Sequence, residues 1–385
     1  MIYLIHTYFD INILQYVTFR AAGAAITALL ISFLWGPKII RTLQDRQIGE
    51  TIRKNGPLTH YLKEGTPTMG GIIMILSIIL PSILWSRYDN IHSWIIIFST
   101  LFMGFIGFID DYLKIVKKLS KGLIARYKLI AQILIGIFVS FMILNYVDNP
   151  KIFIDSNNDF VQSIPNTSIS LPFMASNTIS ENSINGFLEL SSWLYIILVI
   201  IVIIATSNAV NLTDGLDGLA TGLSAISILA MGAIAYASGR VDFSDYLNII
   251  YIKGSDELLV FSFATIGACL GFLWYNSHPA TIFMGDTGSL ALGTALGTLA
   301  VLLRKEILLI IIGGIFVFES LSVIIQVLYF RYTKYRYGKG KRFFLMAPIH
   351  HHFEQQGLLE SKIVVRFWII GILLALFSLS TFKLQ

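Results

Sequence analysis

The stretch WLYIILVIIVIIATSNAVNLTDGLDGLATGLSAISILAMGAIAYA, residues 193–237, contains two long apolar runs separated by a short polar segment. An apolar run of about 20 residues is long enough to cross the hydrocarbon core of a bilayer as a helix. The polar segment contains Asp214 and Asp217, and a carboxylate is costly beside hydrocarbon. The stretch therefore predicts two membrane helices with acidic residues where they meet.

The rest of the chain repeats this pattern. Of its 385 residues 55% are apolar and only 13% are charged, whereas a soluble domain carries about 25% charged residues. We therefore predict an all-α polytopic membrane protein, with about ten transmembrane helices in a single domain over residues 1–385. The predicted spans are 20–40, 70–86, 92–109, 127–147, 193–212, 217–237, 258–275, 287–303, 307–330 and 363–382. The single cysteine, Cys269, excludes an intrachain disulfide.

The positions of lysine and arginine predict the orientation of the spans. Loops 41–69, 110–126 and 331–361 are rich in both residues, and ten spans place all three loops on one side. The positive-inside rule makes that side cytoplasmic, so both termini are predicted to be periplasmic. The same rule explains the basic balance of the chain without a nucleic-acid partner. Loop 148–192 becomes an extended periplasmic loop, whose segment SIPNTSISLPF (163–173) is compatible with a small β-hairpin.

Four polar clusters fall on the cytoplasmic side of this topology. The sequence GFIDDYLK puts Asp110 and Asp111 at the end of the third span, and the DGLDG segment follows the fifth. WYNSHPATIFMGDTGS (274–289) joins the seventh and eighth spans, and MAPIHHHFE (346–354) lies in the last inner loop. Mg²⁺ prefers carboxylate and phosphate oxygens, and lysine and histidine bind phosphates. The four clusters together predict a metal–phosphate site on the cytoplasmic face.

Each cluster also has a structural interpretation when it is taken alone. Asp110 and Asp111 could cap the end of a span, while Asp214 and Asp217 could be an N-cap and a first-turn acid. The histidines at 350–352 could form a solvated loop or a transition-metal site, although three consecutive residues cannot all face one metal in regular structure. These interpretations do not explain why all four clusters lie on one face.

A membrane transporter is an alternative from another functional class. A transporter would place its acidic residues near the middle of the bilayer on broken helices. Here only Glu319 lies deep within a predicted span, and we interpret it as structural, hydrogen-bonded to a neighbour such as Gln326. The position of the other acids at one interface therefore disfavours a transporter.

Six motifs carry a family resemblance. They are GTPTMGG (65–71), GFIDDYLK (107–114), KGLIARYK (121–128), NAVNLTDGLDGLA (208–220), FMGDTGSLALG (283–293) and APIHHHFE (347–354). In this order, and over almost the whole chain, they resemble the motifs of the phospho-N-acetylmuramoyl-pentapeptide transferase (MraY) family. That family is a branch of the polyprenyl-phosphate N-acetylhexosamine-1-phosphate transferases. Loop 148–192 is longer and more polar than the family's usual outer element.

The resemblance implies a fold and a reaction. The expected fold has ten helices in the bacterial inner membrane, with periplasmic termini and a cytoplasmic active site. The expected reaction transfers phospho-N-acetylmuramoyl-pentapeptide from its UDP donor to the membrane lipid undecaprenyl phosphate, in peptidoglycan synthesis. It yields lipid I and UMP and requires Mg²⁺. The resemblance is also compatible with a homodimer. The alternative within the superfamily is a UDP-N-acetylglucosamine transferase, which the PIHHHFE element disfavours.

The resemblance also implies the site residues. The expected catalytic residues are Asp110, Asp111, Asp286 and His351. Asp286 and Asp111 are the expected metal ligands. The expected substrate-binding residues are Lys63, Lys114, Lys128, Asn211, Asp214, Gly215, Asp217, Asn276, Phe283, His350 and His352. Asp110 would position or deprotonate the lipid phosphate for direct attack, which we favour over a covalent phospho-enzyme on Asp110.

Overall fold

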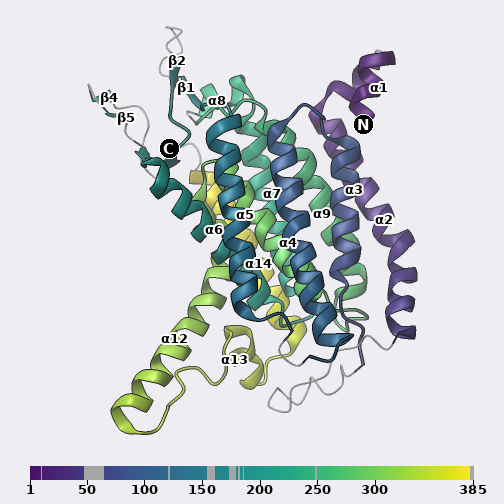
Figure 1. Ribbon diagram of the computed structural model, residues 1–385, viewed down its shortest axis with the longest axis vertical. Helices are drawn as coiled ribbons and strands as arrows, with labels where there is room; N and C mark the ends of the chain where they lie inside the picture. The colour runs from purple at the N-terminus through teal and green to yellow at the C-terminus, as the bar shows by residue number, and fades with distance from the viewer. Residues whose placement is uncertain are drawn as a thin grey trace.

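Helices make up most of the structure, as predicted (Figure 1). The computed structural model describes residues 1–9, 11–46, 65–119, 122–153, 161–172, 179–180, 183–184, 186–247 and 249–381. In this part of the chain eight helices are long and apolar enough to cross a membrane. They are α2 (Val17–Asp45), α4 (Ile91–Ile115), α5 (Ala125–Tyr146), α6 (Ser192–Thr213), α7 (Leu219–Ser238), α9 (Leu258–Asn276), α12 (Gly314–Tyr337) and α14 (Glu360–Ser380). The all-α polytopic membrane class is therefore confirmed.

Two further predicted spans are also helical. α3 (Gly71–Trp85) is apolar but short, and α10 (Gly285–Leu302) is buried along almost its whole length. α10 packs against α3, α4, α6 and α7 and so forms the centre of the bundle. A Cβ atom at Gly293 would lie 2.5 Å from Cα of Ser207 in α6. Such close approach at small residues is typical of helix packing in membranes, where hydrophobicity does not drive helices together.

The ninth predicted span, over residues 307–330, is wrong as a single helix. The chain forms α11 (Glu306–Ile312) and then α12, with a break at Gly313 and a second glycine, Gly314, as the first residue of α12. Glycine lacks a Cβ atom and weakens a helix, and paired small residues are a common cause of sharp kinks. α12 leaves the bundle at an angle and extends beyond it, with α13 (Ile349–Gln355) beside it (Figure 1).

The hairpin predicted over residues 163–173 is also wrong. The segment does contain strand residues, but β2 (Val161–Ser163) pairs with β1 (Lys151–Phe153), and β3 (Ser168–Ser170) pairs with β6 (Phe187–Glu189). A third pair joins β4 (Ile179–Ser180) and β5 (Ser183–Ile184). The side chain of Asn166, just before β3, binds the last turn of α5 and accepts a hydrogen bond from Arg304. The segment therefore packs on the helices instead of folding back on itself.

Short elements cover the end of the bundle that carries these strands. They are α1 (Ile2–Phe9), the 3-10 turn η1 (Asn12–Gln15), α8 (Val241–Leu247) and the 3-10 turn η3 (Ser255–Glu257). Strands β1, β2, β4 and β5 lie near α8 at one end of the bundle, whereas α13 lies at the other (Figure 1). The polar clusters discussed below are all at the α13 end, so the two ends differ in chemistry.

A buried ion pair ties α2 to the turn before α9. Arg20 binds both carboxylate oxygens of Glu257, with an Nη1–Oε2 distance of 2.7 Å, and both side chains are 2% exposed. The main-chain N–H of Arg87 donates to the same Oε2 at 3.1 Å. Removing one partner of such a pair leaves the other charge buried and uncompensated.

We therefore expect Glu257→Gln to lower the free energy of unfolding by about 3–5 kcal/mol. Denaturant titration in mixed micelles would measure the change. The control is Asp89→Asn, because Asp89 forms an exposed pair with Arg87 whose hydrogen bond lowers the pKa of the Asp89 carboxyl. An exposed pair contributes at most about 1 kcal/mol. Equal losses in both variants would contradict a special contribution from the buried pair.

Candidate active site

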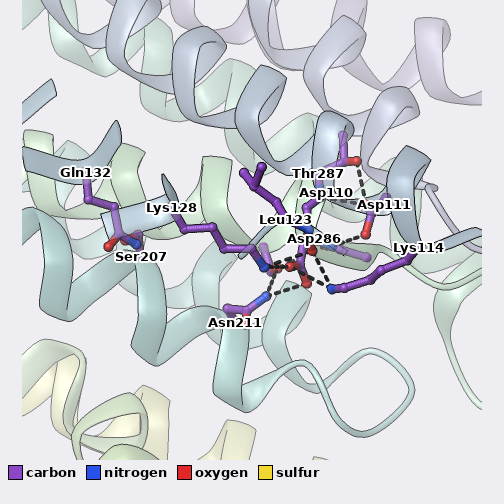
Figure 2. A network of polar contacts seen from close by, with 12 residues as sticks. Asp110, Asp111, Lys114, Leu123, Lys128, Gln132, Ser207, Asn211, Asp286 and Thr287 are labelled. Carbon is purple, nitrogen blue, oxygen red and sulfur yellow. Dashed lines mark hydrogen bonds and ion pairs between the residues drawn. The ribbon is translucent and has the colours of Figure 1, made fainter. Parts of the chain in front are cut away.

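Three aspartates from two helices meet at the α13 end of the bundle. Asp110 and Asp111 lie in the last turns of α4, and Asp286 lies in the first turn of α10 (Figure 2). One oxygen from each carboxylate lies within 4.8 Å of the other two. Asp110 and Asp111 are buried, and the side chain of Asp286 is 15% exposed. Residues separated by more than 170 positions in the sequence thus form one carboxylate cluster.

Two glycines allow α4 and α10 to approach this closely. A Cβ atom at Gly107 would lie 2.2 Å from the main-chain oxygen of Asp286. Gly285 has φ +72°, a left-handed conformation that favours glycine, and a Cβ atom there would lie 2.6 Å from Oδ2 of Asp111. The GFIDD and MGDTG motifs therefore place their glycines where the two backbones need room.

Asp111 caps the N-terminus of α10. Its Oδ1 accepts a hydrogen bond from the N–H of Asp286 at 3.1 Å, and its Oδ2 accepts from the N–H of Thr287 at 2.9 Å and from the Thr287 hydroxyl at 2.6 Å. The first N–H groups of a helix have no partner within the helix, so a carboxylate at this place satisfies them. Asp111 thereby fixes Asp286 relative to α4, whatever further role it has.

Two lysines reach the carboxylates from opposite sides (Figure 2). The ammonium group of Lys128, from α5, is 2.8 Å from Oδ2 of Asp110 and also binds Oδ2 of Asp286. Lys114, one turn after Asp110, binds the same two carboxylates and is 3.1 Å from Oδ2 of Asp286. Three carboxylates therefore face two ammonium groups, which leaves the cluster with a net negative charge.

α6 supplies the fourth side of the cluster. The amide group of Asn211 donates to Oδ1 of Asp286 at 2.9 Å and to the Ser289 hydroxyl at 2.8 Å. One turn earlier, Ser207 accepts a hydrogen bond from Gln132 of α5 at 2.7 Å. Asn211 was among the predicted substrate-binding residues. Ser289 and Gln132 were not, although Ser289 lies inside the GDTGS motif.

A second polar group lies beside the start of α7 and the start of α14. Asp217 Oδ2 is 3.0 Å from Nδ1 of His278 and accepts a hydrogen bond from the N–H of Ala280 at 3.1 Å. Glu360 accepts a hydrogen bond from the N–H of Asp217 at 2.7 Å, and its Oε2 is 3.5 Å from His278 Nδ1. Asp217 was predicted to face the nucleoside. His278 was predicted to lie in the polar cluster of residues 274–289 but was assigned no role, and Glu360 was not singled out from the sequence.

The remaining predicted residues of this region lie around these two groups. Asn276 is buried and joins the segments on either side, since it accepts from the N–H of Gly218 at 3.1 Å and donates to the oxygen of Ile282 at 2.9 Å. Phe283 is half-buried, and its main-chain oxygen accepts from Gly70 at 2.8 Å. Asp214 ends α6. Lys63 lies outside the described residues.

Comparisons with known proteins identify the family. The model of glycosyl transferase family 4 matches residues 93–304. The chain is 46% identical over 386 residues to the phospho-N-acetylmuramoyl-pentapeptide-transferase of Desulfotalea psychrophila, with 100% of this chain and 99% of the relative covered. The chain belongs to the phospho-N-acetylmuramoyl-pentapeptide-transferase family.

Two further relatives carry the same name. The chain is 44% identical over 413 residues to the Flavobacterium johnsoniae protein, with 100% of both chains covered. It is 48% identical over 375 residues to the Pelodictyon phaeoclathratiforme protein, with 97% of this chain and 95% of the relative covered. The family membership therefore extends over the whole chain, including the polar clusters at the α13 end.

The three histidines of this family member have separate partners. On the short helix α13, His351 Nδ1 is 2.7 Å from Oε2 of Glu354. His352 Nδ1 accepts a hydrogen bond from the N–H of Leu345 at 3.2 Å. His350 is buried and points in a third direction. The rings thus do not converge on one point, because consecutive residues of a helix face different sides.

The partner expected for Glu319 is wrong. Its Oε2 lies 3.1 Å from Nδ1 of His350, not beside Gln326. Gln326 instead accepts hydrogen bonds from the main-chain N–H groups of Phe343 and Phe344, at 3.1 and 2.9 Å. The reason is tertiary: the chain folds back after α12, and α13 packs against that helix and brings His350 to its second turn.

The carboxylate cluster fits a divalent cation by its donor chemistry. Asp110, Asp111 and Asp286 offer oxygen atoms within 4.8 Å of one another, and hard cations such as Mg²⁺ prefer oxygen ligands. Lys114 and Lys128 each bind Asp110 and Asp286 and so offset part of the negative charge of the cluster. Their side chains are 38% and 20% exposed, so their ammonium groups can reach a phosphate at the opening of the site.

Proposed function

We propose that this protein transfers phospho-N-acetylmuramoyl-pentapeptide from its UDP donor to undecaprenyl phosphate. The products would be lipid I and UMP, in the first membrane step of peptidoglycan synthesis. One observation carries the proposal beyond family membership: Asp110, Asp286, Lys114 and Lys128 converge at one end of an apolar helix bundle. A lipid phosphate anchored in the bilayer and a water-soluble diphosphate can both reach such a place.

The proposed orientation follows from the basic loops and the helix order. We place ten spans in the bacterial inner membrane: α3 and α10 complete the eight that length and composition identify, and α11 belongs to the same span as α12. The carboxylate cluster then faces the cytoplasm, where the UDP donor is found, and both termini are periplasmic. The chain is one domain over residues 1–385, and loop 148–192 is periplasmic.

The chemistry assigned to the cluster is phosphoryl transfer. An oxygen of the lipid phosphate would attack the phosphorus next to the sugar, and the bond to the UMP phosphate would break. Asp110 would position or deprotonate the attacking phosphate, while Lys114 and Lys128 would turn to the phosphate oxygens of the donor. Asp286 and Asp111 would hold Mg²⁺, which would neutralise charge on the diphosphate. Alignment of two phosphates is the main demand of such a reaction.

The substrate-binding residues surround this centre. We assign Lys63, Asn211, Asp214, Gly215, Asp217 and Phe283 to the nucleoside, with Phe283 stacked on uracil. Asn276, His350 and His352 are assigned to the phosphate and sugar-peptide end, and His351 has a catalytic role there. The family motifs support these assignments, together with the position of Asn211 against Asp286.

The substrate can be tested with purified protein, Mg²⁺, undecaprenyl phosphate and each UDP-sugar in turn. We expect UMP release only with UDP-N-acetylmuramoyl-pentapeptide, and mass spectrometry should detect lipid I. A control without lipid phosphate should release no UMP if attack is direct, whereas a covalent phospho-enzyme would release one equivalent. UMP release with UDP-N-acetylglucosamine alone would refute the proposal.

A further inference from the structure

Glu319 and His350 form a buried pair between α12 and α13. Glu319 Oε2 is 3.1 Å from His350 Nδ1, and both side chains are 0% exposed. The other atoms of the pair, Glu319 Oε1 and His350 Nε2, have no hydrogen-bond partner in the described structure. A carboxylate that is buried in a candidate membrane helix is costly, and functional residues are the usual exception.

The far edge of the His350 ring faces the turn after α6. A Cβ atom at Gly215 would lie 2.2 Å from His350 Nε2. The ring therefore occupies the space where any other residue at position 215 would place its side chain. Asp214 is the preceding residue, and Asn211, in the last turn of α6, donates to Asp286 at 2.9 Å. The pair thus supports the segment that joins the nucleoside end to the carboxylate cluster.

Which nitrogen of the His350 ring carries the proton decides whether the contact between the ring and Gly215 is favourable. A neutral imidazole carries its proton on one nitrogen only. If Nε2 carried it, a buried N–H would face the Gly215 backbone without an acceptor, which is unfavourable. With the proton on Nδ1, Glu319 accepts it, and the bare Nε2 edge can pack against Gly215. An acceptor at Glu319 is therefore what selects the ring form that fits under the turn.

We propose that Glu319 is a positioning residue for binding of the UDP-linked donor: it fixes the Nδ1-protonated form of His350, and that ring sets the position of the Asp214–Gly215 turn. The identity of the donor rests on the function proposed above. Glu319 itself does not touch the donor. Its effect passes through His350, so it is expected to act on donor binding and not on the lipid acceptor.

Three variants of Glu319 separate this role from a general contribution to folding. Glu319→Gln keeps an oxygen acceptor at the same reach, Glu319→Asp keeps the charge but retracts it, and Glu319→Leu removes the acceptor. Loss of a residue that orients a ligand costs about 10–100-fold, so we expect the Leu and Asp variants to raise the KM for the donor about 10-fold or more. The KM for undecaprenyl phosphate should stay unchanged. The Gln variant should restore the donor KM of the wild type.

A matched control is available in the neighbouring helix. Glu306 in α11 is also a buried glutamate, and its carboxylate oxygens have no hydrogen-bond partner in the described structure. Glu306→Leu should leave both KM values unchanged. The proposal would be overturned if Glu319→Leu or Glu319→Asp kept the wild-type KM for the donor. It would also be overturned if these variants raised the KM values for donor and lipid equally, or if Glu306→Leu raised the donor KM as much as they do.

Nitrogen NMR tests the first half of the proposal without any turnover. In protein labelled with ¹⁵N-histidine, the His350 signals are those that disappear in His350→Asn. We expect a protonated Nδ1 and a bare Nε2 in the wild type and in Glu319→Gln, and a mixture of the two forms in Glu319→Leu. A proton on Nε2 in the wild type would overturn the proposal. If no UDP-sugar gave UMP, the proposed function would fail, but this measurement would still decide whether Glu319 fixes His350.

Discussion

Asp286→Asn is expected to abolish turnover and to leave the protein folded. Asp286 meets both lysines through Oδ2 and Asn211 through Oδ1, so it is the carboxylate that links α10 to α4, α5 and α6. The amide has the same shape but no charge, and it removes one of the three carboxylates from the cluster. Loss of charge stabilisation at such a centre costs about 10²–10³-fold, and loss of the metal would lower the rate further.

Release of UMP measures this effect, and gel filtration with thermal unfolding in detergent shows whether the variant is folded. Asp89→Asn is the control, because that carboxylate is half exposed and pairs only with Arg87 among the described residues. The control should keep wild-type turnover. If Asp286→Asn retained near-normal activity, Asp286 would not be a metal ligand and the carboxylate cluster would need another role.

The helices could be predicted because each depends on local sequence. A bilayer requires an apolar run of fixed length, and such a run is visible wherever it occurs. The break at Gly313 was missed because the apolar run continues through it. The strand pairs of loop 148–192 were missed for a related reason. The placement of β3 depends on contacts with Arg304, which is remote in sequence.

The carboxylate cluster could be foreseen in part. The alternation of spans brings Asp110, Asp111 and Asp286 to one end of the bundle. The capping of α10 by Asp111 could not be foreseen, since it depends on the distance between two helices. Glu360 could not be identified from the sequence, because an acidic residue in the first turn of a helix is favourable without any functional role. Glu319 was matched with Gln326 on its own helix, although its partner comes from α13.

Gly107→Ala is expected to lower turnover about 100-fold, because misplacement of catalytic groups by about 1 Å has this effect. The added Cβ atom would lie 2.2 Å from the main-chain oxygen of Asp286 and 2.5 Å from its carbonyl carbon. The main chain of α10 cannot avoid the added atom by a change of rotamer, as a side chain can. α4 and α10 would have to separate, which moves Asp110 and Asp111 away from Asp286. Overpacking of this kind also costs about 1–3 kcal/mol of stability.

Gly104→Ala provides the matched control for this variant. Gly104 lies nearly one turn earlier on α4, and a Cβ atom there would lie 2.3 Å from Cδ1 of Ile75. That atom is the end of a flexible side chain, which can change rotamer at a cost of about 1 kcal/mol. Turnover should therefore stay close to that of the wild type. If both alanine variants released UMP equally fast, the close approach of the two backbones would not be what aligns the carboxylates, and the capping by Asp111 alone would have to do so.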